Sequence, residues 1–305
     1  MAETGAAGGI WTVRRILDWT RDFFTRKNVF QPRLSAEELL AHVLSAPRIK
    51  LFLNYDRALS PAELAAYREL VRRAAEDEPI AYLTGRKHFF NLEFEVTRDV
   101  LIPRPDTETL VEDVLQTARI AAGLETPRIL DLCTGSGCSA AALAHNLKGA
   151  NVLATDISPA AVAIAQRNVE RLGLAGRIVV EEGDLYEPLS RIVDARPFDL
   201  IVANPPYIPT VQLDTLDRSV RDYEPLAALD GGLDGLTLHR RILQEAGARL
   251  VPGGRVYLEI AFDQGDLAFA IASHYEEGFE KPRVLKDFGG RDRVLTLRKK
   301  PDGKT

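Results

Sequence analysis

The first part of the chain has hydrophobic residues at the spacing of an amphipathic helix. Between residues 13 and 27 the apolar side chains include Ile16, Leu17, Phe23 and Phe24. Pairs of apolar positions that recur after about two turns lie on one face of a helix. This segment therefore predicts a helix that buries one face and leaves the other in water.

Two short motifs predict where further helices begin. Ser35–Glu38 and Ser60–Glu63 both run from a serine to a glutamate three residues later. In such a capping box the serine hydroxyl and the glutamate carboxylate each accept a backbone N–H that the first turn leaves unpaired. The helix after Ser60 is expected to end near Asp77, because Pro79 disfavours helical geometry before it. Residues 1–85 are thus expected to form a small helical domain.

A turn signal and an alternating segment separate this helical part from the rest. Thr84-Gly85 is typical of a turn, and Phe89–Val96 alternates apolar and polar residues from Leu92 onward. This segment predicts a strand or a hairpin. Together with the proline-containing stretch up to Pro103, it is interpreted as a β-hairpin linker over residues 86–103.

From residue 104 onward, short apolar runs alternate with helical stretches. The runs are Arg128–Leu132, Asn151–Thr155, Ile178–Glu181, Phe198–Ala203, Arg255–Ile260, Arg283–Lys286 and Arg293–Leu297. Seven strands with helices between the early ones predict a doubly wound, Rossmann-like α/β sheet. Residues 104–305 are accordingly expected to form one domain.

Composition narrows the classes of function. The 305 residues are 46% hydrophobic and 27% charged, as in a globular protein, and carry a formal net charge of -5. Proteins that grip nucleic-acid phosphates usually have a basic surplus, so no direct nucleic-acid binding is expected. No uninterrupted apolar run reaches the ~18 residues of a membrane span. Two cysteines, Cys133 and Cys138, exclude a disulfide framework; with five scattered histidines they predict no metal site and a reduced, cytoplasmic protein.

A glycine-rich turn follows the first predicted strand of the sheet. Asp131–Cys138 reads Asp-Leu-Cys-Thr-Gly-Ser-Gly-Cys, and a helix is expected from about Ser139. Glycines let the backbone turn tightly and approach a ligand closely. Gly135-x-Gly137-x-x-Ala140 also fits the nicotinamide fingerprint, and Asp156 stands where a ribose-binding carboxylate belongs. The loop alone is therefore compatible with a nicotinamide cofactor or with S-adenosylmethionine.

Two further carboxylates distinguish these cofactors. Asp131, at the end of its strand, would repel a pyrophosphate but suits the cationic amino acid head of S-adenosylmethionine. Asp184 follows the third strand, where it can accept a hydrogen bond from an adenine amino group. With Asp156, these carboxylates line the edge at which open parallel sheets bind ligands. The other interpretation is that each aspartate only caps a helix, which is a common role after a strand.

The fourth predicted strand runs straight into the sequence Asn-Pro-Pro-Tyr. Two prolines fix the backbone and remove two donors, while the Asn204 side-chain oxygen and the Pro205 carbonyl remain as acceptors. This arrangement suits a planar –NH2 group, which gives one N–H to each acceptor and lies between apolar rings. A stiff turn without a ligand is the alternative. Asn204, Pro205, Pro206 and Tyr207 are the expected catalytic and substrate-binding residues of a methyl transfer to such a nitrogen.

Together these motifs resemble the PrmC (HemK-type) protein-glutamine N5-methyltransferases. The resemblance covers residues 14–298 and rests on Ile102–Glu108, Asp131–Gly137, Asp156, Asn204–Tyr207, Tyr223–Leu229, Gly231–Leu236, Glu259, Gln264-Gly265 and Asp287–Val294. The family uses S-adenosylmethionine to methylate the glutamine of the Gly-Gly-Gln loop of class I peptide chain release factors. The resemblance implies a helical N-terminal domain that helps hold the release factor. It also implies a seven-stranded S-adenosylmethionine-dependent methyltransferase domain whose last strand runs antiparallel.

The resemblance also assigns residues to the cofactor and the substrate. It implies cofactor contacts at Cys133, Thr134, Gly135, Ser136, Gly137, Asp156, Leu185 and Asn204, and substrate contacts at Asn204–Tyr207. Cys133 departs from the family, which usually has glycine there. The loop with this cysteine looks more like the PrmB enzymes, which methylate a ribosomal-protein glutamine. Pro105–Glu108 favours the release-factor enzymes.

Several other functions remain open. They are a PrmB-like ribosomal-protein glutamine methyltransferase, a nucleic-acid adenine N6-methyltransferase, a cofactor-binding adaptor without catalysis and a nicotinamide oxidoreductase. A flipped adenine also presents a planar amine, but the pI of about 5.7 argues against a nucleic-acid substrate. Intact Asn204–Tyr207 argues against the adaptor, and Asp131 against the oxidoreductase. The protein is expected to act as a monomer, without a membrane partner.

Overall fold

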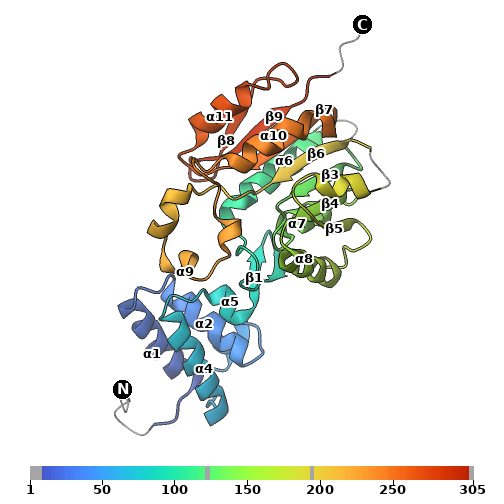
Figure 1. Ribbon diagram of the computed structural model, residues 1–305. Helices are drawn as coiled ribbons and strands as arrows, with labels where there is room; N and C mark the ends of the chain where they lie inside the picture. Colours follow the sequence, from blue (N-terminus) through green and yellow to red (C-terminus); the bar gives the residue numbers. More distant parts are fainter. Residues whose placement is uncertain (1–8, 121–123, 193–195, 302–305) are drawn as a thin grey trace. The chain divides into compact units, whose positions relative to one another are not determined.

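The computed structural model describes residues 9–120, 124–192 and 196–301 (Figure 1). Contacts divide the chain into two compact units, Met1–Gly85 and Arg86–Thr305. One cluster of buried hydrophobic side chains lies within the first unit, and two such clusters lie within the second. Each unit therefore has a hydrophobic core of its own.

The first unit is helical. Its helices are α1 (Val13–Arg26), α2 (Pro32–Val43), α3 (Ile49–Leu53), α4 (Pro61–Ala74) and α5 (Ile80–Thr84). The first predicted helix is confirmed as α1, and Ile16 and Phe24 from it share a buried cluster with Leu39. Helix α4 ends at Ala74 instead of the expected Asp77, because the N–H groups of Glu76 and Asp77 bond to carbonyls three residues back and the φ of +68° at Asp77 is not helical.

One of the two predicted capping boxes is confirmed. The Ser60 hydroxyl accepts from the Glu63 backbone N–H at 3.2 Å, and the Glu63 carboxylate accepts from the Ser60 N–H at 2.8 Å. The box predicted at Ser35 is wrong, since Pro32 begins α2 three residues before it. The proline ring fixes φ at a helical value and needs no N–H partner there. Ser35 lies inside the helix and donates its hydroxyl to the Phe30 carbonyl at 2.8 Å.

The second unit begins with the predicted hairpin. Its strands β1 (Arg86–Phe89) and β2 (Leu92–Glu95) pair antiparallel. The two turn residues, Phe90 and Asn91, have φ of +47° and +62°, and a type I′ turn requires positive φ at both central positions. By its contacts the hairpin belongs to the second unit; its separation as a linker domain stays a prediction.

A seven-stranded sheet follows, and the predicted Rossmann-like α/β fold is confirmed. The strands are β3 (Arg128–Leu132), β4 (Asn151–Asp156), β5 (Ile178–Glu182), β6 (Phe198–Ala203), β7 (Leu250–Glu259), β8 (Arg283–Lys286) and β9 (Asp292–Arg298), in the order β5-β4-β3-β6-β7-β9-β8. Strand β9 pairs antiparallel with both of its neighbours, β7 and β8, and the other four strand pairs of this sheet are parallel, so the last strand runs antiparallel as the resemblance implied. Strand β7 begins five residues before the expected Arg255. The register between β6 and β7 shifts between Phe198 and Leu200. The pairing of Leu250 with Phe198 therefore could not be predicted from the apolar run that begins at Arg255.

Helices cover both faces of this sheet (Figure 1). One layer holds α6 (Glu108–Ile120), α7 (Cys138–Asn146) and α8 (Pro159–Arg171), and the other holds α10 (Thr237–Arg249) and α11 (Gly265–Ser273). Shorter elements are η1 (Pro105–Thr107), η2 (Glu187–Arg191), η3 (Thr210–Thr215), α9 (Arg218–Arg221) and η4 (Leu226–Ala228). Alternate residues of a strand serve the two layers, so Ile129 packs in one cluster and Leu130 in the other. Among the described residues, no helix is long and apolar enough to cross a bilayer.

The order of the strands places the two predicted motifs side by side. Strands β3 and β6 are neighbours, with Leu132 opposite Ala203, although β4 and β5 lie between them in the sequence. Open parallel sheets bind ligands at such a switch point, beyond the carboxyl ends of the strands. The glycine-rich loop leaves β3 there, and the Asn-Pro-Pro-Tyr turn leaves β6.

Candidate active site

The glycine-rich loop turns through three residues with left-handed backbone geometry. Cys133, Gly135 and Gly137 have φ of +56°, +55° and +78°. A Cβ on Gly137 would lie 3.3 Å from the Cβ of Ala165, so this glycine lets α7 pack closely against α8. A Cβ on Gly135 would meet no described atom within 4 Å, so this glycine faces open space. The loop is therefore closed on its helix side and accessible at Gly135.

Cys133 occupies a position that favours glycine. A side chain at a φ of +56° meets the steric cost that restricts this region mainly to glycine. Its side chain packs against the cluster that holds Leu185 and Tyr186. Burial and the neighbouring carboxylates raise the pKa of the thiol, so the group stays neutral. The departure from glycine is thus a strained but well-packed substitution.

Asp131 lies near the end of β3 and is 1% exposed. The Thr134 hydroxyl donates to its carboxylate at 2.6 Å. Burial raises the pKa of Asp131 to about 7, although this hydrogen bond favours the charged form. A buried carboxylate with a raised pKa gains from a cation placed beside it. The predicted role toward a cationic ligand stays a prediction.

Asp156 holds the loop by its backbone. One carboxylate oxygen accepts from the Gly135 N–H at 2.8 Å, and the other accepts from the Ser158 N–H at 3.0 Å. Ser158, not Asp156, is the N-cap of α8, because its hydroxyl accepts from the Ala161 N–H at 3.2 Å. The alternative interpretation of Asp156 as a helix cap is therefore wrong. Its carboxylate joins the tip of β4 to the open glycine of the loop.

The third carboxylate has a partner that the sequence did not indicate. Asp184 accepts from the Arg241 guanidinium of α10 at 2.7 Å. The next residue, Leu185, is buried with a φ of +49°, and its carbonyl accepts from the Thr155 hydroxyl at 3.0 Å. This bond connects the turn after β5 to the end of β4. The three predicted carboxylates thus lie at or just beyond the carboxyl ends of three adjacent strands, as expected.

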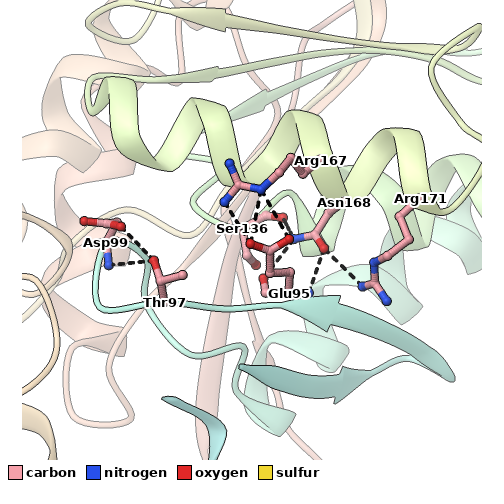
Figure 2. Close-up of polar contacts among 7 residues, drawn as sticks. All are labelled: Glu95, Thr97, Asp99, Ser136, Arg167, Asn168 and Arg171. Carbon is pink, nitrogen blue, oxygen red and sulfur yellow. Dashed lines mark hydrogen bonds and ion pairs between the residues drawn. The ribbon is translucent and has the colours of Figure 1, made fainter. Parts of the chain in front are cut away.

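A buried asparagine connects the loop to the hairpin, and sequence reasoning missed it (Figure 2). Asn168 of α8 is fully buried and makes hydrogen bonds to both backbone groups of Glu95, at 2.7 Å and 3.0 Å. Its amide also donates to the Ser136 carbonyl in the glycine-rich loop at 3.0 Å. Arg167 and Arg171 add contacts to the same strand, at the Glu95 and Glu93 side chains. A polar residue on the apolar face of α8 was the available signal.

The Asn-Pro-Pro-Tyr turn presents acceptors in a fixed orientation. The Asn204 side-chain amide donates to the Thr107 hydroxyl at 3.1 Å, which directs its nitrogen to Thr107 and leaves its oxygen free to accept. Pro205 and Pro206 are buried, so the turn is packed as well as stiff. No described residue donates to the Asn204 side-chain oxygen or to the Pro205 carbonyl. Both predicted acceptors are therefore available.

Tyr207 is held at two points. Its hydroxyl donates to the Glu259 carboxylate at 3.3 Å, and its carbonyl accepts from the Gln264 amide at 2.8 Å. A Cβ on Gly235 would lie 2.2 Å from the same carbonyl, so only glycine fits there. Burial raises the pKa of Tyr207, which keeps the hydroxyl protonated. The motif blocks around Gly235, Glu259 and Gln264 thus fix the aromatic residue of the turn.

Residues from other motif blocks form ion pairs in which at least one partner is buried. Glu224 pairs with Arg104, and Arg293 lies 3.0 Å from Asp106 and 3.3 Å from Asp287. Glu224 and Arg293 are themselves buried, so each pair shields a charge that would otherwise lack a counter-ion. These pairs anchor the segment before α6. Thr107 belongs to this segment and accepts the hydrogen bond from Asn204. No group of three potential metal ligands occurs in the described part of the chain.

Comparisons with known proteins agree with this architecture. The family model described as PrmC N-terminal domain matches residues 15–85, and the one described as methyltransferase small domain matches residues 106–220. A release factor glutamine methyltransferase from Geobacter sulfurreducens is 46% identical over 286 residues, which cover 94% of this chain and 96% of that protein. One from Rhodopirellula baltica is 38% identical over 300 residues, which cover 98% and 100%.

Solved structures also resemble the chain. A release factor-specific protein-(glutamine-N5) methyltransferase from Alicyclobacillus acidocaldarius is 33% identical, with 68% of this chain and 100% of that chain covered and a TM-score of 0.42. The catalytic domain of hMettl16, in complex with the MAT2A 3′UTR hairpin 6, is 18% identical over 71% of this chain and 78% of its own, with a TM-score of 0.53; it shares the fold. Because the two curated relatives match over nearly their whole length, the chain belongs to the family of release factor glutamine methyltransferases.

Proposed function

We propose that the protein transfers a methyl group from S-adenosylmethionine to the side-chain amide nitrogen, N5, of the Gly-Gly-Gln glutamine in class I release factors. The observation that carries this proposal is the orientation of Asn204. Its amide nitrogen is bound to Thr107, so its oxygen and the Pro205 carbonyl offer two acceptors to a planar –NH2 group. Hydroxyl or thiol substrates have a single hydrogen and would leave one of these acceptors unpaired.

The residues around the glycine-rich loop fit S-adenosylmethionine. Gly135 faces open space, and the buried Asp131 carboxylate gains from a cationic amino acid head. Asp156 is held at the tip of β4, in a place suited to a ribose diol, and we assign Asp184 and Leu185, beyond β5, to the adenine. Cys133, Thr134, Ser136 and Gly137 complete the loop. When bound, S-adenosylmethionine supplies a methyl group on a cationic sulfur and leaves as the neutral thioether.

The turn makes the amide nitrogen reactive by positioning it. An amide lone pair is delocalised into its carbonyl, and two hydrogen-bond acceptors on the –NH2 group return electron density to the nitrogen. With S-adenosylmethionine bound at the loop, the substrate nitrogen would take the methyl group through its lone pair and give its proton to water. Fixed geometry of this kind is worth effective molarities of about 10⁵–10⁸ M. Glu259 and Gln264 hold Tyr207, whose ring would pack against the plane of the substrate amide.

The release factor is supported as substrate by the family and by the helical unit. The relatives are named release factor glutamine methyltransferases, and the match to the PrmC N-terminal domain covers nearly all of the first unit. The helical unit has its own core, so it can offer a surface for the body of a protein substrate. We place the reaction in the cytoplasm, which fits two free cysteines among the described residues, and we propose a monomer as the active form.

A transfer assay with radiolabelled S-adenosylmethionine tests the proposal. Release factor, its Gly-Gly-Gln glutamine-to-alanine variant, ribosomal large subunits and DNA are offered to the enzyme in parallel. We expect label on the wild-type factor alone. Label on a ribosomal protein would instead support the PrmB-like function, and label on DNA the adenine function.

Asn204→Ala gives the matching test of the site. We expect it to lower turnover by about 10²–10³-fold, as the loss of one preorganised polar contact does elsewhere, because one acceptor of the amide is lost. Cofactor affinity, measured by calorimetry, should stay within about threefold, since the loop carboxylates are intact. An unchanged turnover would remove Asn204 from the mechanism.

A further inference from the structure

The segment that follows the Asn-Pro-Pro-Tyr turn has regular helical turns but almost no buried side chain. It contains η3, α9 and η4, and none of these three elements has a buried residue (Figure 1). From Ile208 to Tyr223 every residue is at least partly exposed. Helices of a globular domain normally bury one face against their own core. A run of this length without a buried residue therefore leaves its surface available to another molecule.

Both ends of this segment lie at the candidate site. The Ile208 N–H, directly after the Asn-Pro-Pro-Tyr turn, donates to the Leu229 carbonyl at 3.0 Å, and the Thr210 N–H donates to the Gly232 carbonyl at 2.9 Å. Residues 211–228 thus leave the turn and return to it, and we call them the 211–228 loop. Connections of this length within a compact domain are usually functional, as binding loops or lids.

The returning limb of the 211–228 loop is fixed to the stretch that follows the hairpin. The Arg98 guanidinium lies 4.9 Å from the centre of the Tyr223 ring. Glu224 is buried, accepts from the Ile102 N–H at 3.3 Å and pairs with Arg104. All of these residues belong to the second unit, as the loop does. Because these contacts hold the loop in place, a partner that binds it loses little free energy in ordering its backbone.

The exposed side chains of the 211–228 loop are apolar and acidic. Val211 and Leu226 are 76% and 61% exposed, and Leu233, just beyond the loop, is 85% exposed. Asp214 and Asp217 are exposed too, and within the described part of the chain neither forms an ion pair. Exposed apolar residues that gather in one segment are typical of interaction sites, and charges favour a partner of opposite sign. The loop therefore suits a polypeptide with apolar and basic side chains.

We infer that the 211–228 loop is the docking surface for the release factor polypeptide on either side of the methylated glutamine. This inference rests on the proposed function. A glutamine whose amide lies at Asn204–Tyr207 belongs to a chain, which must continue over the segments beside the turn. Six extended residues span about 20 Å, so several residues next to the glutamine come within reach of a loop that starts and ends at the turn.

Two double variants test the docking surface by steady-state kinetics. Val211→Ser with Leu226→Ser removes the apolar side chains, and we expect the KM for the release factor to rise about 10-fold, as for truncated interface residues. Asp214→Lys with Asp217→Lys reverses the charge, and we expect a rise of roughly 3-fold or more, because exposed charge pairs are weaker. In both variants kcat and the KM for S-adenosylmethionine should stay within about twofold, since the site itself is unchanged.

Matched controls lie away from the candidate site. Val179→Ser alters an exposed valine near the start of the edge strand β5, and Glu276→Lys alters an exposed glutamate beyond the end of α11. Both should leave the KM for the release factor unchanged. The urea midpoints of all variants should match the wild type, because none of the altered side chains is buried. A KM in the serine double variant equal to that of Val179→Ser overturns the inference.

A binding measurement separates this inference from the proposed function, because it needs no methyl transfer. The release factor variant with alanine in place of the Gly-Gly-Gln glutamine is titrated into the full-length enzyme with S-adenosylhomocysteine present, and calorimetry gives its Kd. We expect the serine double variant to weaken this binding about 10-fold and Val179→Ser to leave it unchanged. If the factor is never labelled but this difference is found, the proposed function fails and the docking surface stands. If the two variants bind equally, the docking surface fails whatever the transfer assay shows.

Discussion

At the residue scale, Cys133 shows that the glycine-rich loop requires left-handed backbone geometry even at a residue that is not glycine. The chain places a side chain at a φ of +56°, where a residue other than glycine carries a cost of roughly 1–2 kcal/mol. The sequence revealed the unusual residue, because a cysteine stands in a glycine-rich motif. It did not reveal the backbone angle, which follows from the way that Thr134 binds both Asp131 and the Thr155 carbonyl.

Substitution at Cys133 should therefore reverse the usual ranking of alanine and glycine. We expect Cys133→Gly to be more stable than Cys133→Ala by about 1 kcal/mol, since glycine removes the left-handed strain and alanine keeps it. Urea unfolding of the two variants measures the difference. Cys138, the first residue of α7, is the matched control, and there glycine should be less stable than alanine by about 0.5–1 kcal/mol. The same ranking at both positions would contradict the strain at Cys133.

At the scale of elements, the strands were largely predictable, whereas their order in the sheet and the contacts between distant segments were not. Short apolar runs between helical stretches marked β3, β6 and β8 at the bounds observed. The pairs Asn168–Glu95 and Glu224–Arg104 join residues 73 and 120 positions apart, and no local pattern specifies such partners. For the same reason the Asn204 acceptors were predictable from their motif, but Thr107 as their support was not.

Asn168 joins the hairpin to the glycine-rich loop through hydrogen bonds to both (Figure 2). Its replacement by alanine would leave the Glu95 backbone groups and the Ser136 carbonyl without a partner. Each unsatisfied buried group costs about 1–3 kcal/mol, so we expect Asn168→Ala to lower the free energy of unfolding by roughly 3 kcal/mol. We also expect weaker binding of S-adenosylmethionine, because the loop loses its support at Ser136.

The control for this prediction is Arg167→Ala, which removes only a solvent-exposed ion pair with Glu95. Such pairs contribute about 0–1 kcal/mol, so this variant should stay close to the wild type in urea unfolding. Calorimetry with S-adenosylmethionine supplies the second measurement. Equal cofactor affinity in Asn168→Ala and Arg167→Ala would show that Asn168 stabilises the fold without positioning the loop.

At the scale of the whole molecule, the proposed function assigns different roles to the two units. The loop, the Asn-Pro-Pro-Tyr turn and every residue assigned to the cofactor lie within the second unit, Arg86–Thr305. The first unit matches the family model described as PrmC N-terminal domain over residues 15–85. We propose that this unit holds the body of the release factor while the second unit carries the residues of the candidate site.

Removal of the helical unit should therefore separate substrate capture from chemistry. A chain that starts at Arg86 retains both clusters of the second core, so we expect it to fold and to bind S-adenosylmethionine within about threefold of the full chain. Its kcat/KM for an intact release factor should fall at least 10-fold, since the binding energy of the first unit is lost and each 1.4 kcal/mol is a factor of ten. With a short Gly-Gly-Gln peptide, which has no protein body to hold, both chains should react at equal rates. Equal kcat/KM for the intact factor would show that the first unit takes no part in substrate binding.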